Sequence, residues 1–282
     1  MSPYLIEGPA VISFSGGRTS GYMLKHILDA HDGALPEDVE VVFANTGKER
    51  PETLDFVRDC EQNWNLSIVG VEYAVKGRSH AFKEVNHRTA SRNGGPFDLM
   101  IEKKKILPNP TQRFCTTELK IKPMQRLAKA RGWKHFTNVI GLRADEPRRV
   151  ARARQRGESG KDDWDVATPL AVAGVSKHVV KTWWGERNFN LNLPDIGGVT
   201  PAGNCDLCFL KTAANLSGLM RDYPGSSAWW MEKEQALEPT RGRAGLFRAD
   251  RPSYAALQDA VDRQEDFDFG DADALGDCFC HD

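Results

Sequence analysis

The sequence predicts an α/β fold with a doubly wound parallel sheet and a small cysteine-bearing C-terminal appendage. Three apolar runs, at residues 10–14, 39–44 and 67–73, have the length and composition of buried strands. The first two runs are each followed by a segment whose apolar residues recur at helical spacing. Because strands that alternate with helices form parallel sheets covered on both faces, this pattern predicts the doubly wound class.

The first apolar run ends in a turn rich in serine and glycine, Ser13-Phe14-Ser15-Gly16-Gly17-Arg18-Thr19-Ser20. Apolar residues from Met23 to Leu28 then recur at helical spacing, so the turn connects a strand to a helix. Gly16 and Gly17 let the backbone approach a ligand that a Cβ would obstruct. The start of the helix adds unpaired N–H groups. The turn therefore predicts a phosphate site.

The second and third runs extend the same pattern. Residues 39–44 lead into Asn45-Thr46-Gly47, and Pro51 suits the first position of the helix that follows. Ligands of open α/β sheets bind beyond the carboxyl ends of the strands. We therefore expect the turns at Ser15 and Asn45 to lie at the same ligand-binding edge.

The middle of the chain is less regular. We interpret residues 76–111, which contain Gly94-Gly95-Pro96, as an irregular excursion over the site. A helix is predicted over 117–131 and a strand over 136–140. The basic stretch 143–156 has two interpretations that the residues leave open, a nucleic-acid contact and a mobile solvated arm.

Length and charge limit the classes of function. The 282 residues are enough for one large domain with an appendage, and we expect a nucleotide-binding domain at 1–194 and a helical, cysteine-bearing region at 195–282. Since the formal net charge is −1, the molecule as a whole does not attract nucleic acid. No apolar run is long enough to cross a membrane and no signal segment is seen, so we expect a cytoplasmic protein.

Five stretches carry a resemblance to known enzymes. The first is Ser15-Gly16-Gly17-x-x-Ser20. The others, in order, are Asn45-Thr46-Gly47-x-x-x-Pro51-Glu52-Thr53, Arg113-Phe114-Cys115 with Lys120-x-x-Pro123, Gly141-x-Arg143-x-x-Glu146-x-Arg148, and Thr168-Pro169-Leu170 with Trp183-Trp184. Together they resemble the phosphoadenosine phosphosulfate (PAPS) reductase family and the PP-loop N-type ATP pyrophosphatases, which have the adenine nucleotide alpha-hydrolase-like fold. Thr19 stands where the PP-loop most often has Asp.

The resemblance implies an adenine nucleotide, either ATP or PAPS or adenylyl sulfate, at the ligand-binding edge of the sheet. The implied nucleotide-binding residues are Ser13, Phe14, Ser15, Gly16, Gly17, Arg18, Thr19, Ser20, Asn45, Thr46, Gly47, Arg113 and Gly141. Lys120, Arg143 and Arg148 are predicted to be catalytic, because cationic groups stabilise the negative charge that develops during attack at an α-phosphate. Magnesium on the phosphates is left open.

Four cysteines have the spacing of metal ligands. Cys205-x-x-Cys208 and Cys278-x-Cys280 supply four thiolates. The resemblance favours a 4Fe-4S cluster, with zinc as the alternative, and adds Cys115 as a further candidate ligand. It also offers a rival interpretation, in which Cys278 is an unligated nucleophile near the C-terminus.

Three functional hypotheses follow. The first is an enzyme of sulfur metabolism that acts at the α-phosphate of ATP or a related adenylate, as in ATP pyrophosphatases that activate an acceptor for sulfur transfer. The second is a PAPS or adenylyl-sulfate reductase in which Cys278 attacks sulfur. The third is a non-catalytic subunit that binds nucleotide or nucleic acid in a complex. The expected partners are the nucleotide and either a nucleic-acid acceptor or a sulfur- or thiol-donor protein, and a homo-oligomer is left open.

Overall fold

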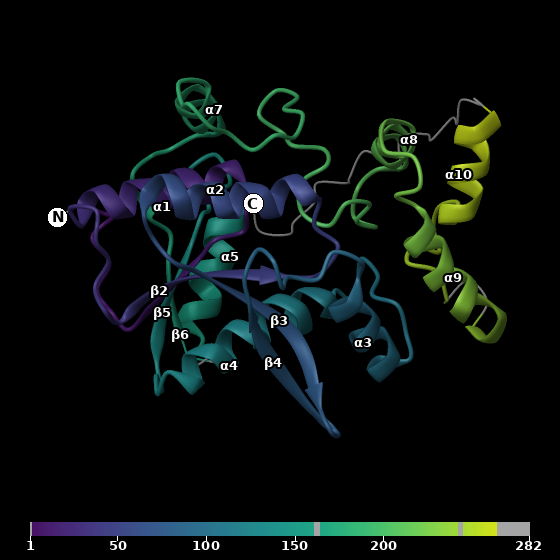
Figure 1. Cartoon of the computed structure of the whole chain (residues 1–282), viewed down its shortest axis with the longest axis horizontal. Coiled ribbons are helices and arrows are strands. Elements are labelled where there is room, and N and C mark those ends of the chain that lie inside the picture. The colour runs from purple at the N-terminus through teal and green to yellow at the C-terminus, as the bar shows by residue number, and fades with distance from the viewer. Residues whose placement is uncertain (1, 161–163, 242–244, 264–282) are drawn as a thin grey trace.

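The computed structural model describes residues 2–160, 164–241 and 245–263, and within these ranges the chain folds around a six-stranded sheet (Figure 1). The strands are β1 (Ala10–Ser13), β2 (Val39–Asn45), β3 (Ile68–Lys76), β4 (Ser79–Val85), β5 (Phe136–Ile140) and β6 (Trp164–Ala167). Their order is β4-β3-β2-β1-β5-β6, and every neighbouring pair is parallel except β3 and β4. The predicted α/β class is confirmed.

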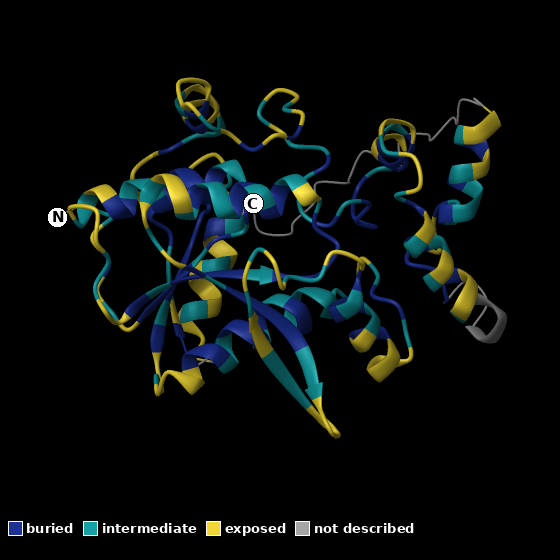
Figure 2. Cartoon of the chain, viewed as in Figure 1, coloured by how far each residue is buried: buried dark blue, intermediate teal, exposed yellow. Residues whose placement is uncertain are grey.

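Helices cover both faces of this sheet. They are α1 (Arg18–Ala30), α2 (Pro51–Trp64), α3 (Gly95–Lys104), the π-helix η1 (Thr116–Ile121), α4 (Lys122–Ala130), α5 (Pro147–Glu158), α6 (Pro169–Val172), α7 (Lys177–Gly185), α8 (Ala213–Asp222), α9 (Ala228–Arg241) and α10 (Tyr254–Arg263). On one face Ile12 packs with Met23 of α1 and Leu54 of α2. On the other face Val11 packs with Leu127 of α4. Buried residues accordingly follow the strands and the inner sides of the helices (Figure 2).

The order of the strands creates a topological switch point between β1 and β5. From β1 the chain moves outward to β2 and β3, where Ile12 pairs in parallel with Val41. It then returns to the opposite side of β1, where Ile12 pairs with Val139 of β5. Open parallel sheets bind ligands at such a point, beyond the carboxyl ends of the strands. The turns after β1 and β5 are therefore the first places to look for a site.

Helices α8, α9 and α10 lie together to one side of the sheet (Figure 1). Their core is aromatic, since Trp230 lies 4.9 Å from Phe247 and 5.3 Å from Tyr254 between ring centroids. Trp230 also lies 6.0 Å from Phe97 of α3, so the apolar core continues from this group of helices to the sheet. The domain boundary at residue 195 stays a prediction. None of the helices within the described ranges is long and apolar enough to cross a bilayer.

The interpretation of residues 76–111 as irregular is wrong for 79–85 and 95–104, which form β4 and α3, whereas 86–94 and 105–111 are irregular as expected. Gly77 and Arg78 form a two-residue turn, after which β4 pairs antiparallel with β3. As an edge strand with polar residues, β4 owes its position to hydrogen bonds with its neighbour more than to burial, so its sequence gives little signal. Pro96, which we placed in this irregular segment, lies in the first turn of α3, where proline is well tolerated.

Two further segments differ from expectation. The helix predicted over 117–131 is divided into η1 and α4, and Pro123 near the junction lacks the N–H that a continuous α-helical ladder needs there. Most of the basic stretch 143–156 forms α5 rather than a mobile arm. Pro147 begins this helix, and Val150 anchors it against Ile140 of β5.

Candidate active site

The turn between β1 and α1 has a fixed shape. Gly16 has a φ of +75°, and a Cβ there would approach Thr53 Cγ2 to 2.7 Å, so both conformation and packing require glycine. The Ser20 hydroxyl accepts a hydrogen bond from the Ser15 backbone N–H at 3.2 Å. Gly17 provides no side-chain cap for α1. The first N–H groups of α1 are therefore available to an anion.

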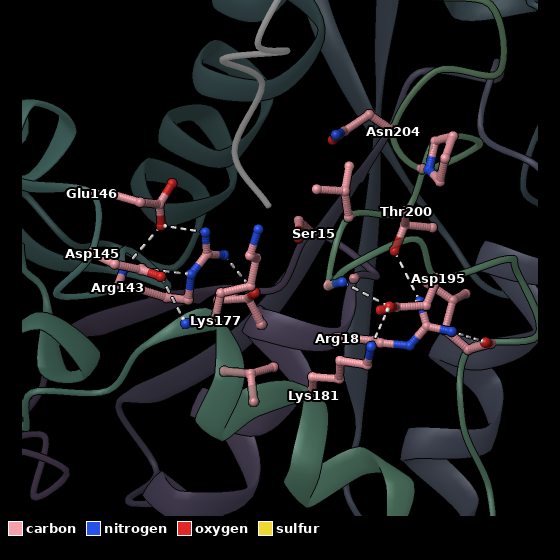
Figure 3. A pocket seen from close by; sticks show the side chains of 18 of the residues that line it. Ser15, Arg18, Arg143, Asp145, Glu146, Lys177, Lys181, Asp195, Thr200 and Asn204 are labelled. Carbon is pink, nitrogen blue, oxygen red and sulfur yellow. Dashed lines mark hydrogen bonds and ion pairs between the residues drawn. The ribbon is translucent and has the colours of Figure 1, made fainter. Parts of the chain in front are cut away.

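A cavity of about 590 Å³ opens at the switch point (Figure 3). The glycine turn, residues 143–149, helix α7 and residues 191–204 contribute to its lining. Its cationic side chains are Arg18, Arg143, Arg148, Arg149, Lys177, Lys181 and Lys211, and its carboxylates are Asp145, Glu146 and Asp195. Seven cations and three carboxylates leave a surplus of four positive charges, although the chain has a net charge of −1. A cavity with this surplus suits a polyanion.

Arg143, in the loop after β5, is fixed against the glycine turn. Its Nη1 donates to Thr19 Oγ1 at 3.0 Å, and its guanidinium pairs with Asp145 at 3.0 Å and Glu146 at 3.4 Å (Figure 3). Burial by itself would raise the pKa of Asp145, but the Lys177 backbone N–H and the charge of Arg143 outweigh it and lower that pKa. The ionised carboxylate therefore holds Arg143 in place. This geometry suits the catalytic role predicted for Arg143.

The Arg18 side chain extends toward residues 190–200, which form one wall of the cavity. Its guanidinium donates four hydrogen bonds of 2.6 to 2.9 Å to this segment. The acceptors are Asn190 Oδ1, Thr200 Oγ1 and the carbonyl oxygens of Leu191 and Leu193. Burial lowers the pKa of Arg18, and Asp195 partly offsets this effect. Arg18 thus ties the glycine turn to the wall, and contact of its side chain with a nucleotide stays a prediction.

Three other cations of the cavity have no carboxylate partner within the described part of the chain. Arg148 is exposed in the first turn of α5, and Lys177 begins α7. Lys211 is only 5% exposed, and its Nζ donates to the carbonyl oxygens of Gly203, Cys205 and Asp206 at 2.6 to 2.9 Å. Lys177 and Lys211 were not expected. The four-residue spacing of Lys177 and Lys181 on a helix was a usable signal for the first, whereas nothing local indicated the second.

Residues 45–47 lie at the carboxyl end of β2 but line neither this cavity nor the smaller one described below. The Asn45 amide donates to Glu72 Oε1 at 2.6 Å, and the Thr46 hydroxyl donates to Glu49 at 2.8 Å. Both residues are buried, so these bonds stabilise the turn after β2. Direct contact of residues 45–47 with a nucleotide stays a prediction.

A second, largely apolar cavity of about 110 Å³ lies on the α4 side of β1. Lys120 lines it from η1, together with Met124 and Ile140. The Ser13 hydroxyl, at its edge, donates to Asn138 Oδ1 at 2.7 Å. Ser15 lines both cavities, so the two adjoin at the glycine turn. Of the other predicted site residues, Phe14 lines the smaller cavity, whereas Arg113 and Gly141 line neither.

Cys205 and Cys208 share one turn, in which the Cys208 N–H donates to the Cys205 carbonyl oxygen at 3.3 Å. The Cys205 Sγ lies 3.4 Å from Thr46 Oγ1. Burial raises the pKa of Cys205 to about 12, and Cys115 is near enough to add a small effect in the same direction. The structure therefore brings three of the predicted cysteines into one neighbourhood.

The described residues alone do not assemble a metal site. They contain no group of three His, Cys, Asp or Glu side chains that could hold an ion. Cys278 and Cys280 lie outside the described residues, so the predicted four-cysteine site is not tested. The carboxylates of the main cavity are each paired with a cation, as Asp195 is with Lys181 at 3.7 Å. Magnesium on the phosphates of a bound nucleotide stays a prediction.

Comparison with known proteins gives a family match. The profile of the phosphoadenosine phosphosulfate reductase domain matches residues 9–172, which is more than half of the chain. The uncharacterized nin region protein ORF290 of Escherichia phage lambda is 29% identical over 224 residues, covering 76% of this chain and 70% of that protein. The uncharacterized protein MJ0066 of Methanocaldococcus jannaschii is 26% identical over 141 residues, covering 50% of this chain and 24% of the archaeal protein.

Two solved structures are also similar. One is phosphoadenylyl-sulfate (PAPS) reductase from Candida auris in a phosphate complex, with 18% identity, a TM-score of 0.41 and coverage of 68% of this chain and 82% of that one. The other is the U34-tRNA thiolase NcsA from Methanococcus maripaludis with its 4Fe-4S cluster, with 13% identity, a TM-score of 0.44 and coverage of 90% and 71%.

Proposed function

We propose that this chain, which belongs to the phosphoadenosine phosphosulfate reductase family, binds ATP or a related adenylate in the main cavity and acts at its α-phosphate. The observation that carries the proposal is the glycine turn beneath a cavity with four surplus positive charges. An uncapped helix N-terminus and a cationic cavity at a topological switch point together suit a nucleotide phosphate chain.

In this proposal the phosphates bind at the start of α1, where Gly17 leaves the backbone N–H groups accessible. Arg143, held by Asp145 and Thr19, supplies a cation that needs no rearrangement. Arg148 and Lys177 add charge that carboxylates do not neutralise within the described part of the chain. Preorganised cations of this kind stabilise the charge that develops during phosphoryl or adenylyl transfer.

The base of the nucleotide is assigned to the smaller cavity. That cavity adjoins the glycine turn through Ser15, and its lining includes Met124 and Ile140. Apolar walls with a few polar groups are typical of sites for heteroaromatic rings. Lys120 lies at this cavity rather than at the main one, so its proposed role is to approach the nucleotide from the side of the base.

The proposed reaction uses this arrangement in one step. A nucleophilic atom of an acceptor forms a bond to the α-phosphorus, and the bond from that phosphorus to the bridging oxygen breaks. Pyrophosphate leaves with the electron pair, and the acceptor is adenylylated and so activated for sulfur transfer. The chain contributes positioning and charge stabilisation, which account for most of the catalysis at phosphorus.

A second candidate is favoured by the family match itself, namely reduction of PAPS or adenylyl sulfate. These substrates share the adenosine and the 5′-phosphate with ATP but carry sulfate beyond it. A thiolate would attack the sulfur, the bond from sulfur to the 5′-phosphate oxygen would break, and the adenosine phosphate would leave with the electron pair. A second thiol would then attack the sulfur of the first, releasing sulfite and leaving a disulfide between the two thiols. Cys278 remains the proposed nucleophile, and it lies outside the described residues.

The cysteine turn is proposed to be part of a metal centre, with a 4Fe-4S cluster preferred and zinc as the alternative. Cys205 and Cys208 would hold it together with Cys278 and Cys280. When bound, a cluster would stabilise the turn or take part in sulfur transfer. Since the described residues alone do not assemble this site, no step of the reaction is assigned to it.

Gly17 offers a sharp test of nucleotide binding. It has an extended φ of −105°, and a Cβ there would meet only the Ser15 hydroxyl at 3.5 Å, so a side chain fits without strain. Gly17→Asp would place a carboxylate at the phosphate site, whereas Gly17→Asn has the same shape without the charge. We expect ATP affinity to fall by about 10²-fold or more in Gly17→Asp relative to Gly17→Asn.

Calorimetric titration with ATP and PAPS measures this difference, and thermal melting verifies that both variants fold. If Gly17→Asp binds ATP as tightly as Gly17→Asn does, and binds PAPS as tightly as Gly17→Asn does, the assignment of the phosphate site is refuted. Release of labelled pyrophosphate from ATP, or of sulfite from labelled PAPS, then distinguishes the two enzyme candidates. Binding of a nucleotide with neither product would support a non-catalytic subunit.

A further inference from the structure

The Lys211 ammonium lies between the main cavity and the cysteine turn, residues 205–208, and no step of the proposed reaction uses it. We propose that Lys211 is a positioning residue: the anion of a bound nucleotide supplies the counter-charge of this ammonium, and the ammonium fixes the cysteine turn. Nucleotide binding and the order of the turn are then coupled. This inference rests on the proposed function, since it requires an anion in the main cavity.

Three hydrogen bonds join the ammonium to the backbone on both sides of this junction. Nζ donates to the carbonyl oxygen of Gly203 at 2.8 Å, and to those of Cys205 and Asp206 at 2.6 and 2.9 Å. Gly203 lines the main cavity, whereas Cys205 and Asp206 belong to the turn. An ammonium has three N–H donors, so all of them are used here. The three bonds therefore link the wall of the cavity to the cysteine turn.

The backbone of Lys211 strengthens this link. Its N–H donates to the Cys208 carbonyl oxygen at 2.9 Å, so Lys211 contacts the carbonyl oxygens of both cysteines. Its own carbonyl oxygen accepts a hydrogen bond of 2.6 Å from Arg251 Nη1. A displacement of Lys211 would therefore be transmitted to Cys205 and Cys208 together.

The charge of Lys211 has no carboxylate partner among the residues that the structure describes. Lys211 is only 5% exposed, and the acceptors of its ammonium are neutral carbonyl groups. The Asp206 carboxylate is bound elsewhere, because it pairs with Lys48 at 3.1 Å and accepts from Trp230 Nε1 at 2.9 Å. A buried cation is unfavourable unless it is compensated. The phosphate chain of a nucleotide is the anion that would complete this compensation, because Lys211 lines the cavity proposed to bind it.

The coupling acts in both directions. An anion in the cavity would stabilise the ammonium in its present position and so stabilise its three bonds to the wall and the turn. An ordered turn would in return hold the ammonium where it attracts the anion, and thermodynamic linkage makes the two effects equal. Sites coupled in this way change each other's equilibria by about 5- to 150-fold. We therefore expect a bound nucleotide to lower the open population of the turn by roughly tenfold.

Lys48 offers a matched control. It is also a buried lysine that supports the turn, since its carbonyl oxygen accepts from the Asp206 N–H at 2.7 Å and its Nζ pairs with Asp206 Oδ2 at 3.1 Å. Unlike Lys211, it lines neither the main cavity nor the smaller apolar cavity. Removal of its charge should therefore loosen the turn to the same extent with and without nucleotide.

The experiment measures hydrogen exchange in the full chain with and without saturating ATP, within one anaerobic preparation of each variant so that the metal content is constant. The amides to follow are those at positions 206, 208 and 211, which donate to the carbonyl oxygens of Lys48, Cys205 and Cys208. In the wild-type protein we expect ATP to slow their exchange roughly tenfold. In Lys211→Met exchange should be faster and independent of ATP, whereas Lys48→Met should keep the ATP effect.

A merely structural role of Lys211 predicts faster exchange in Lys211→Met with an unchanged effect of ATP, and that result refutes the proposal. Equal loss of the ATP effect in Lys48→Met refutes it as well. Lys211→Gln, which also lacks the charge, replaces Lys211→Met if the latter does not fold.

The wild-type protein alone separates this inference from the proposed function. If calorimetry shows that ATP binds but exchange in the turn does not change, the coupling is overturned while the proposed function stands. If neither ATP nor PAPS binds, the proposed function fails and the coupling fails with it.

Discussion

Replacement of Arg18 by alanine should detach one wall of the cavity while the sheet stays folded. Arg18 lies at the first position of α1, yet its guanidinium is bonded to residues 190–200 rather than to its own helix. Its side chain is 12% exposed. The segment that it holds continues into Thr200, Gly203 and Asn204, which line the cavity. The variant thus tests whether the glycine turn and the wall act as one unit.

The size of the effect follows from the hydrogen bonds. Four bonds of 2.6 to 2.9 Å are lost, and each contributes about 1 kcal/mol net, so the segment loses about 4 kcal/mol of stabilisation. If the segment opens independently, 4 kcal/mol corresponds to about a 10³-fold larger open population. The strands should be unaffected, because Arg18 makes no side-chain bond to them. The nucleotide should then bind more weakly because the wall is no longer ordered.

Hydrogen exchange measures the open population of residues 190–200 directly. The amides to follow are those of Ile196, Val199 and Gly203, which donate to backbone carbonyls of the segment. We expect their protection to fall by up to about 10³-fold in Arg18→Ala. Lys181→Ala is the control, because it removes the other cation at Asp195 but only an exposed, 3.7 Å pair of small energetic value. Unchanged protection in Arg18→Ala would refute the reasoning.

Two other predictions concern the catalytic cations and the metal. Arg148→Ala should reduce turnover by about 10²-fold without a change in melting temperature. Arg143→Ala should reduce both, because it removes the cation paired with Asp145 and one of the two cations paired with Glu146, the other being Arg149. Activity and melting curves measured side by side test this, and full activity of Arg148→Ala contradicts it. Anaerobically purified protein should contain iron and sulfide that Cys280→Ser largely loses; elemental analysis tests this, and zinc or no metal in the wild-type protein contradicts the cluster.

Much of the fold could be predicted from the sequence because the central strands are buried on both faces. Residues 10–14 and 39–44 are almost entirely apolar, with Ser13 and Glu40 as their only polar members, as a sheet covered by helices requires. The predicted strand 136–140 coincides with β5. The glycine turn after β1 was equally clear, because a strand, two glycines and an amphipathic helix occur in direct succession. Each of these signals comes from residues that are adjacent in the sequence, and the structure has the predicted element at each place.

The edge strands could not be predicted in the same way. β4 is half exposed and polar, and β6 has four residues of which only Trp164 is buried. Such strands are specified by the neighbours with which they pair, so a pattern of hydrophobic residues along the chain does not identify them. The π-helix η1 was not predicted either. It precedes Pro123 of α4, which has no N–H to donate to the preceding turn, and the pattern of apolar residues does not reveal this change in hydrogen bonding.

The site was only partly accessible from the sequence because some side chains act across long separations. Arg18 bonds to residues more than 170 positions away, and Lys211 reaches the cavity from beyond the cysteine turn. A sequence motif shows which residues are near the ligand, but it does not show hydrogen-bond partners that are far away in the sequence. Conversely, Asn45 resembles a nucleotide-binding residue, but its amide is bonded to the buried Glu72.

The protonation state of Cys205 bears on whether this thiol can act as a nucleophile. A thiol attacks phosphorus or sulfur as the thiolate, and burial raises the pKa of Cys205 to about 12, so the protonated thiol is the dominant form at neutral pH. The Lys211 ammonium donates to the carbonyl oxygens of Gly203, Cys205 and Asp206, and these bonds stabilise the turn that keeps Cys205 buried. Burial of this kind suits a structural thiol or a metal ligand, since binding to a metal removes the proton that burial otherwise retains. Reductase chemistry in this chain therefore requires a nucleophile other than Cys205.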